Sequence, residues 1–186
     1  MIVYHGSNSN FKNFKISKSL VKHQSTMENE GLGIYFSTDK RVAESYGKYL
    51  YTLSIDDRIV YNFNDYKTCH QYINNIARYI LDKTKVNIGY LVDLSAIATN
   101  MQLGGVSIAN IDKELLLWFD SREAWHTQMT EKSRNAVKKA LREVLKINSA
   151  KVYLFNYHIK GCGVAKSADL VKIINKECNG IRAGGV

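Results

Sequence analysis

The sequence of 186 residues contains no proline, so its turns and helix ends depend on glycine, asparagine, aspartate and serine. It has three cysteines, Cys69, Cys162 and Cys178, in no spacing that is typical of a metal site or a disulfide framework. The histidines show no metal-ligand spacing either. We therefore expect free thiols in a reducing compartment and no bound metal.

Long apolar runs are also lacking. No stretch approaches the ~18 consecutive apolar residues of a membrane span, and the start "MIVYHGS" has no basic segment followed by an apolar one. The patterns G-x-G-x-x-G and G-x-x-x-x-G-K-[ST] are absent, which excludes the Rossmann and P-loop ways of holding a nucleotide. We expect a cytoplasmic protein with no membrane segment and no secretory signal.

The composition, with 45% hydrophobic and 23% charged residues, is typical of a folded domain, and the length fits a single one. Positive charge is concentrated near the end of the chain. Residues 131–186 hold 12 Lys and Arg against 4 Asp and Glu, in a protein of net charge +9. Such a field attracts anionic partners, such as nucleic acid, a phosphorylated cofactor or an acidic protein.

Hydrophobic periodicity predicts a sheet-rich beginning, a helical middle and a mixed end. The middle helix over 130–147 is the clearest, because four apolar residues recur on one side of it and basic residues cover the rest. That apolar stripe consists of Val137, Leu141, Val144 and Leu145. The expected strands are 1–5, 33–37, 49–55, 59–63 and 151–159, with a loop over 6–31. The first expected helix is short, capped by Ser37 or Thr38 and ended by Gly47. The others are 65–82, helical segments between 90 and 130, a helix over 130–147 and a helix over 167–180, which a flexible tail follows.

Two blocks carry the functional signal: "YHGS" at 4–7 and "GLGIYFSTDKRVAESYG" at 31–47. Phe11 and Phe14 follow the first block, and Tyr35 and Tyr46 lie 11 residues apart in the second. Together they resemble the ADP-ribosyltransferases of the diphtheria-toxin and poly(ADP-ribose) polymerase type. They also resemble the small phage and mobile-element domains of that superfamily.

The resemblance implies an α+β fold: a split antiparallel β-sheet of the ADP-ribosyltransferase type, in one domain over 1–186 with a helical insertion over about 64–150. It implies a mono-ADP-ribosyltransferase that uses NAD, releases nicotinamide and modifies a protein or nucleic acid. Such a reaction passes through an oxocarbenium-like transition state, as glycoside hydrolysis does. Residues 64–150 lie outside the resemblance.

The resemblance also assigns roles to residues. His5 would bond a hydroxyl of the nicotinamide ribose, the backbone of Gly6 would hold the carboxamide, and Ser7 would reach the adenosine side. Tyr35 and Tyr46 would sandwich the nicotinamide ring, with His5 and Tyr35 as the catalytic pair. Glycine allows a close backbone approach, and aromatic faces suit a planar ring. The cofactor site would be completed by Gly33, Phe36 and Ser37.

The third element of the family, a glutamate on a late strand, is not found. The ending "NKECNGIRAGGV" matches the segment before that strand, and we expect the strand itself to be missing or to lie beyond Val186. Glu177 is the nearest carboxylate, and Glu123 and Glu143 are weaker candidates. The missing glutamate keeps open a second hypothesis, a catalytically inactive module that binds NAD or ADP-ribose.

The basic helix over 130–147 allows two interpretations. Its lysines form an ordinary solvated face, or they dock an acidic or nucleic-acid acceptor through Lys138, Lys139 and Arg142. A third hypothesis follows from the second interpretation: a basic nucleic-acid-binding protein in which the family-like core is only a scaffold.

Overall fold

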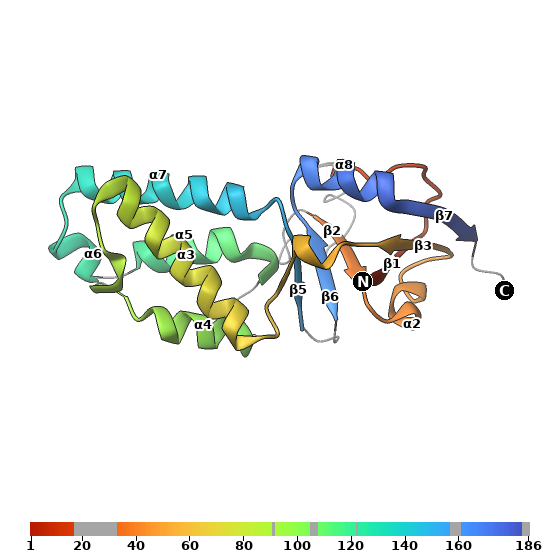
Figure 1. Ribbon diagram of the computed structural model, residues 1–186, viewed down its shortest axis with the longest axis horizontal. Helices are drawn as coiled ribbons and strands as arrows, with labels where there is room; N and C mark the ends of the chain where they lie inside the picture. The colour runs from red at the N-terminus through yellow and green to blue at the C-terminus, as the bar shows by residue number, and fades with distance from the viewer. Residues whose placement is uncertain (17–32, 91, 105–107, 122, 157–160, 184–186) are drawn as a thin grey trace. The chain divides into compact units, whose positions relative to one another are not determined.

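The computed structural model describes residues 1–16, 33–90, 92–104, 108–121, 123–156 and 161–183. The chain forms two compact units, drawn together in Figure 1. One combines Met1–Asn62 with Ser149–Val186, and we call it the sheet unit; the other, Phe63–Asn148, is the helical unit. Each is described by itself.

The sheet unit is built on one seven-stranded sheet of order β4-β5-β6-β2-β1-β3-β7. All neighbours are antiparallel except β4 and β5, which are parallel. The mixed α and β composition expected from the sequence is confirmed, but a purely antiparallel sheet is wrong. Parallel strands need a long crossover between them, and the whole helical unit connects β4 to β5. The strands are β1 (Ile2–Ser7), β2 (Ile34–Ser37), β3 (Tyr49–Ser54), β4 (Val60–Asn62), β5 (Val152–Phe155), β6 (Cys162–Ala165) and β7 (Cys178–Ala183).

The sheet is almost divided between β1 and β2. Six residue pairs join β1 to β3, from Ile2↔Ser54 to Ser7↔Tyr49, and four join β2 to β6. Only one pair, Tyr4↔Ser37, joins β1 to β2. The two halves therefore meet at a short seam: β2 ends at Ser37, and its residues before Ser37 do not pair with β1.

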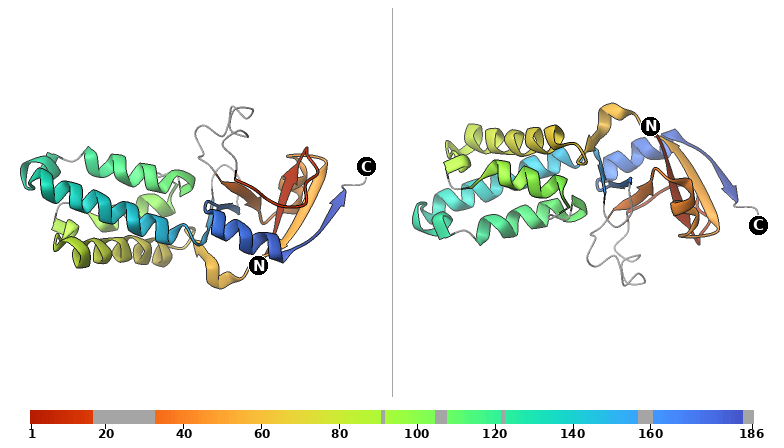
Figure 2. Two further views of the ribbon diagram at one scale, coloured as in Figure 1. Left: turned by 90° about the horizontal axis from the view of Figure 1, so that it is seen from above. Right: turned by 90° about the horizontal axis from the view of Figure 1, so that it is seen from below.

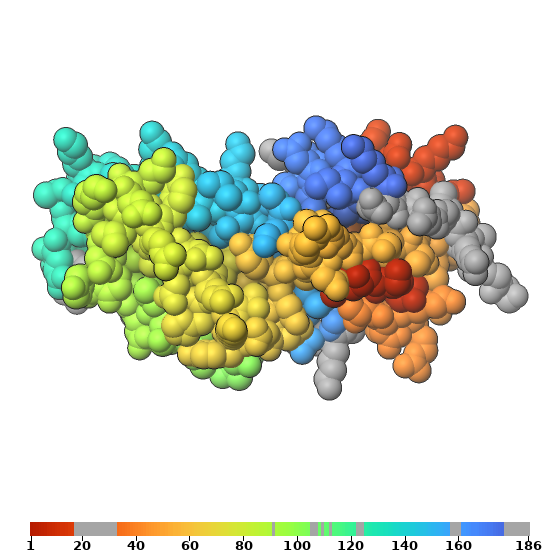
Figure 3. Space-filling model, in the orientation of Figure 1, coloured from red at the N-terminus to blue at the C-terminus, as the bar shows by residue number. Residues whose placement is uncertain are grey.

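One face of the sheet carries the main core. Because side chains alternate along a strand, Val3, Phe36 and Tyr51 lie on this face, where they pack with Leu170 and Ile174 of α8 (Ala168–Glu177). Figures 1 and 2 show α8 lying along the sheet, and Figure 3 shows it at the surface. The opposite face receives the short helix α2 (Lys40–Glu44).

In the helical unit the sequence predicted the first helix with its Asp65 cap and the apolar stripe of the last helix, whereas the helices between them were predicted only as apolar helical segments between 90 and 130. Asp65 accepts from Thr68 N at the start of α3, and Asp93 accepts from Ala96 N at the start of α4. The predicted stripe of α7 is buried as expected, and α3 packs against both α4 and α7. The helices are α3 (Tyr66–Thr84), α4 (Leu94–Gln102), α5 (Ile111–Asp120), α6 (Glu123–Thr127) and α7 (Glu131–Asn148).

Several local predictions were wrong. Gly6 and Ser7 belong to β1 and not to a loop, and α2 is capped by Asp39, whose side chain accepts from Arg41 N at 2.9 Å. Strand β6 was missed, since "CGVA" is short and contains glycine, a weak strand former. The predicted helix over 167–180 ends at Glu177, and residues 178–183 form β7 in place of a flexible tail. The strand after α8 is thus present, without a glutamate in it.

Candidate functional site

The main chain of Gly6 faces the seam between β1 and β2. Ile55 N donates to Met1 O at 2.8 Å and Met1 N donates to Ile55 O at 2.6 Å, so these residues form a hydrogen-bonded pair at the start of the β1–β3 ladder. Such pairs alternate along an antiparallel ladder, which turns the main-chain groups of Tyr4 and Gly6 away from β3. Tyr4 pairs with Ser37, and no further residue of β1 pairs with β2. Gly6 N–H and C=O therefore point to an edge where β2 has parted.

Tyr35 and Tyr46 lie on the same face of the sheet as the missing side chain of Gly6. Tyr35 precedes Phe36, which belongs to the core, so Tyr35 points to the other face. Tyr46 follows α2, and a β-carbon placed on Gly6 would lie 3.3 Å from Cβ of Tyr46. The Tyr46 side chain is 62% exposed. Two tyrosines thus lie on the face of the sheet on which a side chain at Gly6 would lie, and Cβ of Tyr46 is among the atoms nearest to that position.

Gly6 has a packing role as well. A β-carbon there would overlap the main-chain carbonyl of Ala43 in α2. Gly33 is constrained by a side chain instead, because its β-carbon would lie 2.5 Å from Cγ2 of Val164 on β6. Both glycines are therefore required by the close approach of neighbouring chain segments, whether or not a ligand binds.

His5 points to the face opposite Gly6, into a group of rings that we call the aromatic cluster. Its Nδ1 lies 2.7 Å from the carbonyl oxygen of Tyr35. A carbonyl can only accept, so Nδ1 carries the proton and Nε2 is the acceptor of the neutral ring. Burial lowers the pKa of His5 below its usual 6.5, while the bond to Tyr35 acts in the opposite direction. The aromatic cluster consists of His5, Phe11, Phe14, Phe36 and Tyr51.

The residues assigned by the resemblance are therefore divided between two faces. Gly6, Tyr35 and Tyr46 gather on one, while His5 and Phe36 lie on the other. Two serines make local bonds: Ser7 Oγ accepts from Ser9 N at 3.1 Å, and Ser37 Oγ accepts from Asp39 N at 3.0 Å.

The environment of His5 predicts a pH dependence of stability. The folded protein favours the neutral imidazole, so the unfolded chain binds more protons below about pH 6.5. We expect the stabilisation of the folded protein by neutral His5 to be fully present above this pH. It should be lost as the pH falls below it, because the unfolded chain then gains free energy by binding the proton. The measurement is the free energy of unfolding of wild type and His5→Phe between about pH 8 and pH 5. If the difference in unfolding free energy between wild type and His5→Phe is the same at about pH 8 and at about pH 5, the prediction is contradicted. The control is His126→Gln, which alters an exposed histidine.

Carboxylates are missing from the strands. The seven described strands contain no aspartate or glutamate. Glu177 is the last residue of α8, and its side chain lies outside the described part. Glu143 belongs to α7, where its carboxylate accepts from Tyr79 OH at 3.1 Å, and Glu123 starts α6. None of the candidate glutamates therefore lies on a strand of the sheet.

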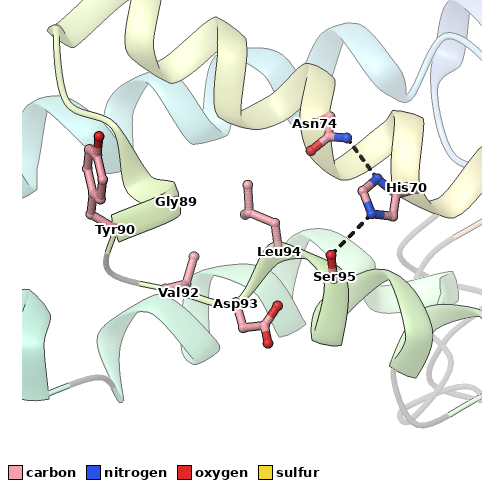
Figure 4. A pocket seen from close by; sticks show the side chains of 8 residues that line it. All are labelled: His70, Asn74, Gly89, Tyr90, Val92, Asp93, Leu94 and Ser95. Atoms are coloured by element: carbon pink, nitrogen blue, oxygen red, sulfur yellow. Dashed lines mark hydrogen bonds between the residues drawn. The ribbon is translucent and has the colours of Figure 1, made fainter.

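A depression in the helical unit was not predicted. It has a volume of about 600 Å³ and is open to solvent, and His70 lies at one side of it (Figure 4). Asn74 Nδ2 donates to His70 Nδ1 at 2.8 Å, and His70 Nε2 lies 3.2 Å from Ser95 Oγ. The sequence signal was the spacing of His70 and Asn74, one helical turn apart. The lining residues are His70, Asn74, Gly89, Tyr90, Val92, Asp93, Leu94 and Ser95.

Two further features bear on the class of protein. Within the part of the chain that the structure describes, no three His, Cys, Asp or Glu side chains are grouped so that they could hold a metal ion. No helix among the described residues is long and apolar enough to cross a membrane.

No protein-family model matches the chain, and no match was found among curated proteins or solved structures.

Proposed function

We propose that the sheet unit binds NAD at the Gly6 edge and that the protein is a mono-ADP-ribosyltransferase. The observation that supports this most is the parting of β1 and β2 beside Gly6, with Tyr35 and Tyr46 on the same face. A carboxamide offers one N–H donor group and one C=O acceptor. These match the acceptor and donor of a single residue's main chain, while tyrosine rings cover a planar ring.

The proposed reaction breaks the bond between the nicotinamide nitrogen and the ribose C1′, and both electrons leave with nicotinamide. The acceptor's lone pair forms the new bond to C1′, and the acceptor loses its proton to base or solvent. Nicotinamide leaves as a neutral molecule because it is cationic in NAD, so no general acid is required. The protein's task is to orient the ribose and to keep water out.

In this proposal His5 helps to keep β1 and β2 from pairing beyond Tyr4 and Ser37. If the β1–β2 register continued, Gly6 would be the residue opposite Tyr35. The carbonyl of Tyr35 instead accepts from the His5 imidazole. The His5 imidazole therefore engages one of the two lone pairs of an oxygen that a continued register would direct at Gly6 N–H, and the proposal assigns the Gly6 main chain to the ligand.

A second candidate is a module that binds NAD or ADP-ribose without transferring it. The absence of acidic residues from the seven described strands favours this candidate, since a carboxylate near the ribose stabilises the developing positive charge. Both candidates share the same cofactor site.

The first test is thermal unfolding with and without NAD. Binding to the folded state alone should raise stability by about 2.7 kcal/mol at a hundredfold excess over Kd, which is several °C for a chain of this size. Tyr35→Ala should remove most of that rise. Tyr90→Ala, in the helical unit and 86% exposed, should keep it. An unchanged midpoint of the wild type at millimolar NAD would contradict both candidates.

Nicotinamide release then separates the two. Free nicotinamide is measured by chromatography after incubation with NAD and a cell extract as the source of acceptor. Release that depends on Tyr35 supports a transferase, and binding without any release supports the inactive module.

A further inference from the structure

Helix α7 has a buried side and a basic side. Its apolar stripe packs inside the helical unit, and its exposed side chains project from the surface (Figure 3). At about 100° per residue, the basic residues opposite the stripe fall within an arc of about 80° and extend over about 21 Å of the axis. We call these four residues the α7 basic face: Lys132, Lys139, Arg142 and Lys146.

The other two cations of α7 are already engaged. Lys138 Nζ lies 2.5 Å from a carboxylate oxygen of Asp120, and Arg134 donates to Met129 O at 2.7 Å. The basic face differs from them. Three of its members are exposed and have no ion-pair or hydrogen-bond partner among the described residues: Lys132, Lys139 and Arg142.

One carboxylate borders this face. Glu143 is half-buried, accepts from Tyr79 OH and lies one helical turn from Lys139 and Lys146, and Glu131 lies in the first helical turn outside the arc, so four cations stand against one adjacent carboxylate. The side chains between the cations are small or polar, since Asn135 and Ala136 are the exposed residues there. The face therefore offers concentrated positive charge, and the large apolar side chain beside it, Ile147, which is 59% exposed, lies at its end and not among the cations.

We propose that the α7 basic face binds the phosphate backbone of a nucleic acid without reading its sequence. Phosphate contacts need only Lys, Arg and small polar donors, all of which this face supplies. Protein interfaces instead centre on aromatic or aliphatic anchors, whereas the exposed side chains between Lys132 and Lys139 are those of Asn135 and Ala136. An extent of about 21 Å is enough to follow several consecutive phosphates. The proposal does not depend on the NAD site, so either can fail alone.

The test is fluorescence anisotropy of a labelled DNA duplex and a labelled single strand, with the full chain and without NAD. The variant K132Q/K139Q/R142Q is compared with K67Q/R78Q/K113Q, which removes the same charge from other exposed positions of the helical unit. The first variant should bind about tenfold more weakly or worse, and its slope of log K against log salt should fall by about 3. The second should stay within about twofold of wild type.

Three results would overturn the proposal. One is no detectable binding by the wild type at low salt. Another is an equal loss in both variants, which would assign binding to net charge and not to this face. The third is displacement of DNA by polyglutamate as effectively as by unlabelled DNA of equal charge, which would indicate an acidic protein partner.

Discussion

Replacing Gly6 by alanine should destabilise the protein by about 1–3 kcal/mol and abolish the stabilisation that NAD is expected to give. The new β-carbon would overlap the carbonyl of Ala43, so α2 must move away from β1. Tyr46 follows α2 and would move with it. A main-chain contact of this kind cannot be relieved by a change of rotamer, which is why the smallest possible substitution should have a large effect.

Gly163→Ala is the matched control for this prediction. Gly163 lies on β6 in the same sheet, but a β-carbon there would meet nothing closer than 3.7 Å. Chemical denaturation of both variants measures the difference, and thermal shifts with NAD measure the loss of binding. Equal stabilities of the two variants would show that α2 does not press on β1. A Gly6→Ala protein that is destabilised but keeps its NAD shift would remove Gly6 from the cofactor site.

The first and last helices of the helical unit were predictable because their signals are local. An aspartate cap followed by apolar residues at helical spacing specifies where α3 begins and which side is buried, and α3 obeys both. The sheet depends on partners distant in sequence. "CGVA" becomes β6 because it lies between β2 and β5, and "CNGIRA" becomes β7 because β3 has a free edge. Neither segment has a strong strand pattern of its own, so single-sequence reasoning missed both.

In the candidate site, too, some features follow from the local sequence and others depend on how distant strands pair. The resemblance named the residues, and the spacing of Tyr35 and Tyr46 is a property of the sequence. The face on which each residue lies depends on strand alternation, which reverses with a shift of one residue. Because β1 extends to Ser7, His5 and Gly6 are successive strand residues and point to opposite faces. The predicted loop starting at Gly6 did not require His5 and Gly6 to point to opposite faces of the sheet.

The aromatic cluster connects the segment after β1 to the sheet through one side chain. Tyr51 is 1% exposed, and its ring stacks on Phe11 with centroids 4.2 Å apart and planes 9° from parallel. Its hydroxyl accepts from Phe11 N at 2.8 Å and lies 3.2 Å from the carbonyl oxygens of Ser9 and Phe11. Tyr51 thus contributes both ring packing and hydrogen bonds. Comparing Tyr51→Ala with Tyr51→Phe separates the stabilisation by the ring from that by the hydroxyl.

Tyr51→Ala should cost about 3–5 kcal/mol of unfolding free energy, because it leaves a large cavity beside His5, Phe11 and Phe14. Tyr51→Phe keeps the ring and should cost about 1–3 kcal/mol, since Phe11 N–H loses its acceptor. Denaturation curves give both values, and amide hydrogen exchange at Phe11 should accelerate in Tyr51→Phe. Tyr90→Phe, at an exposed position, should change neither measurement. If Tyr51→Phe is as stable as wild type and Phe11 stays protected, the hydroxyl does not hold this segment against the sheet.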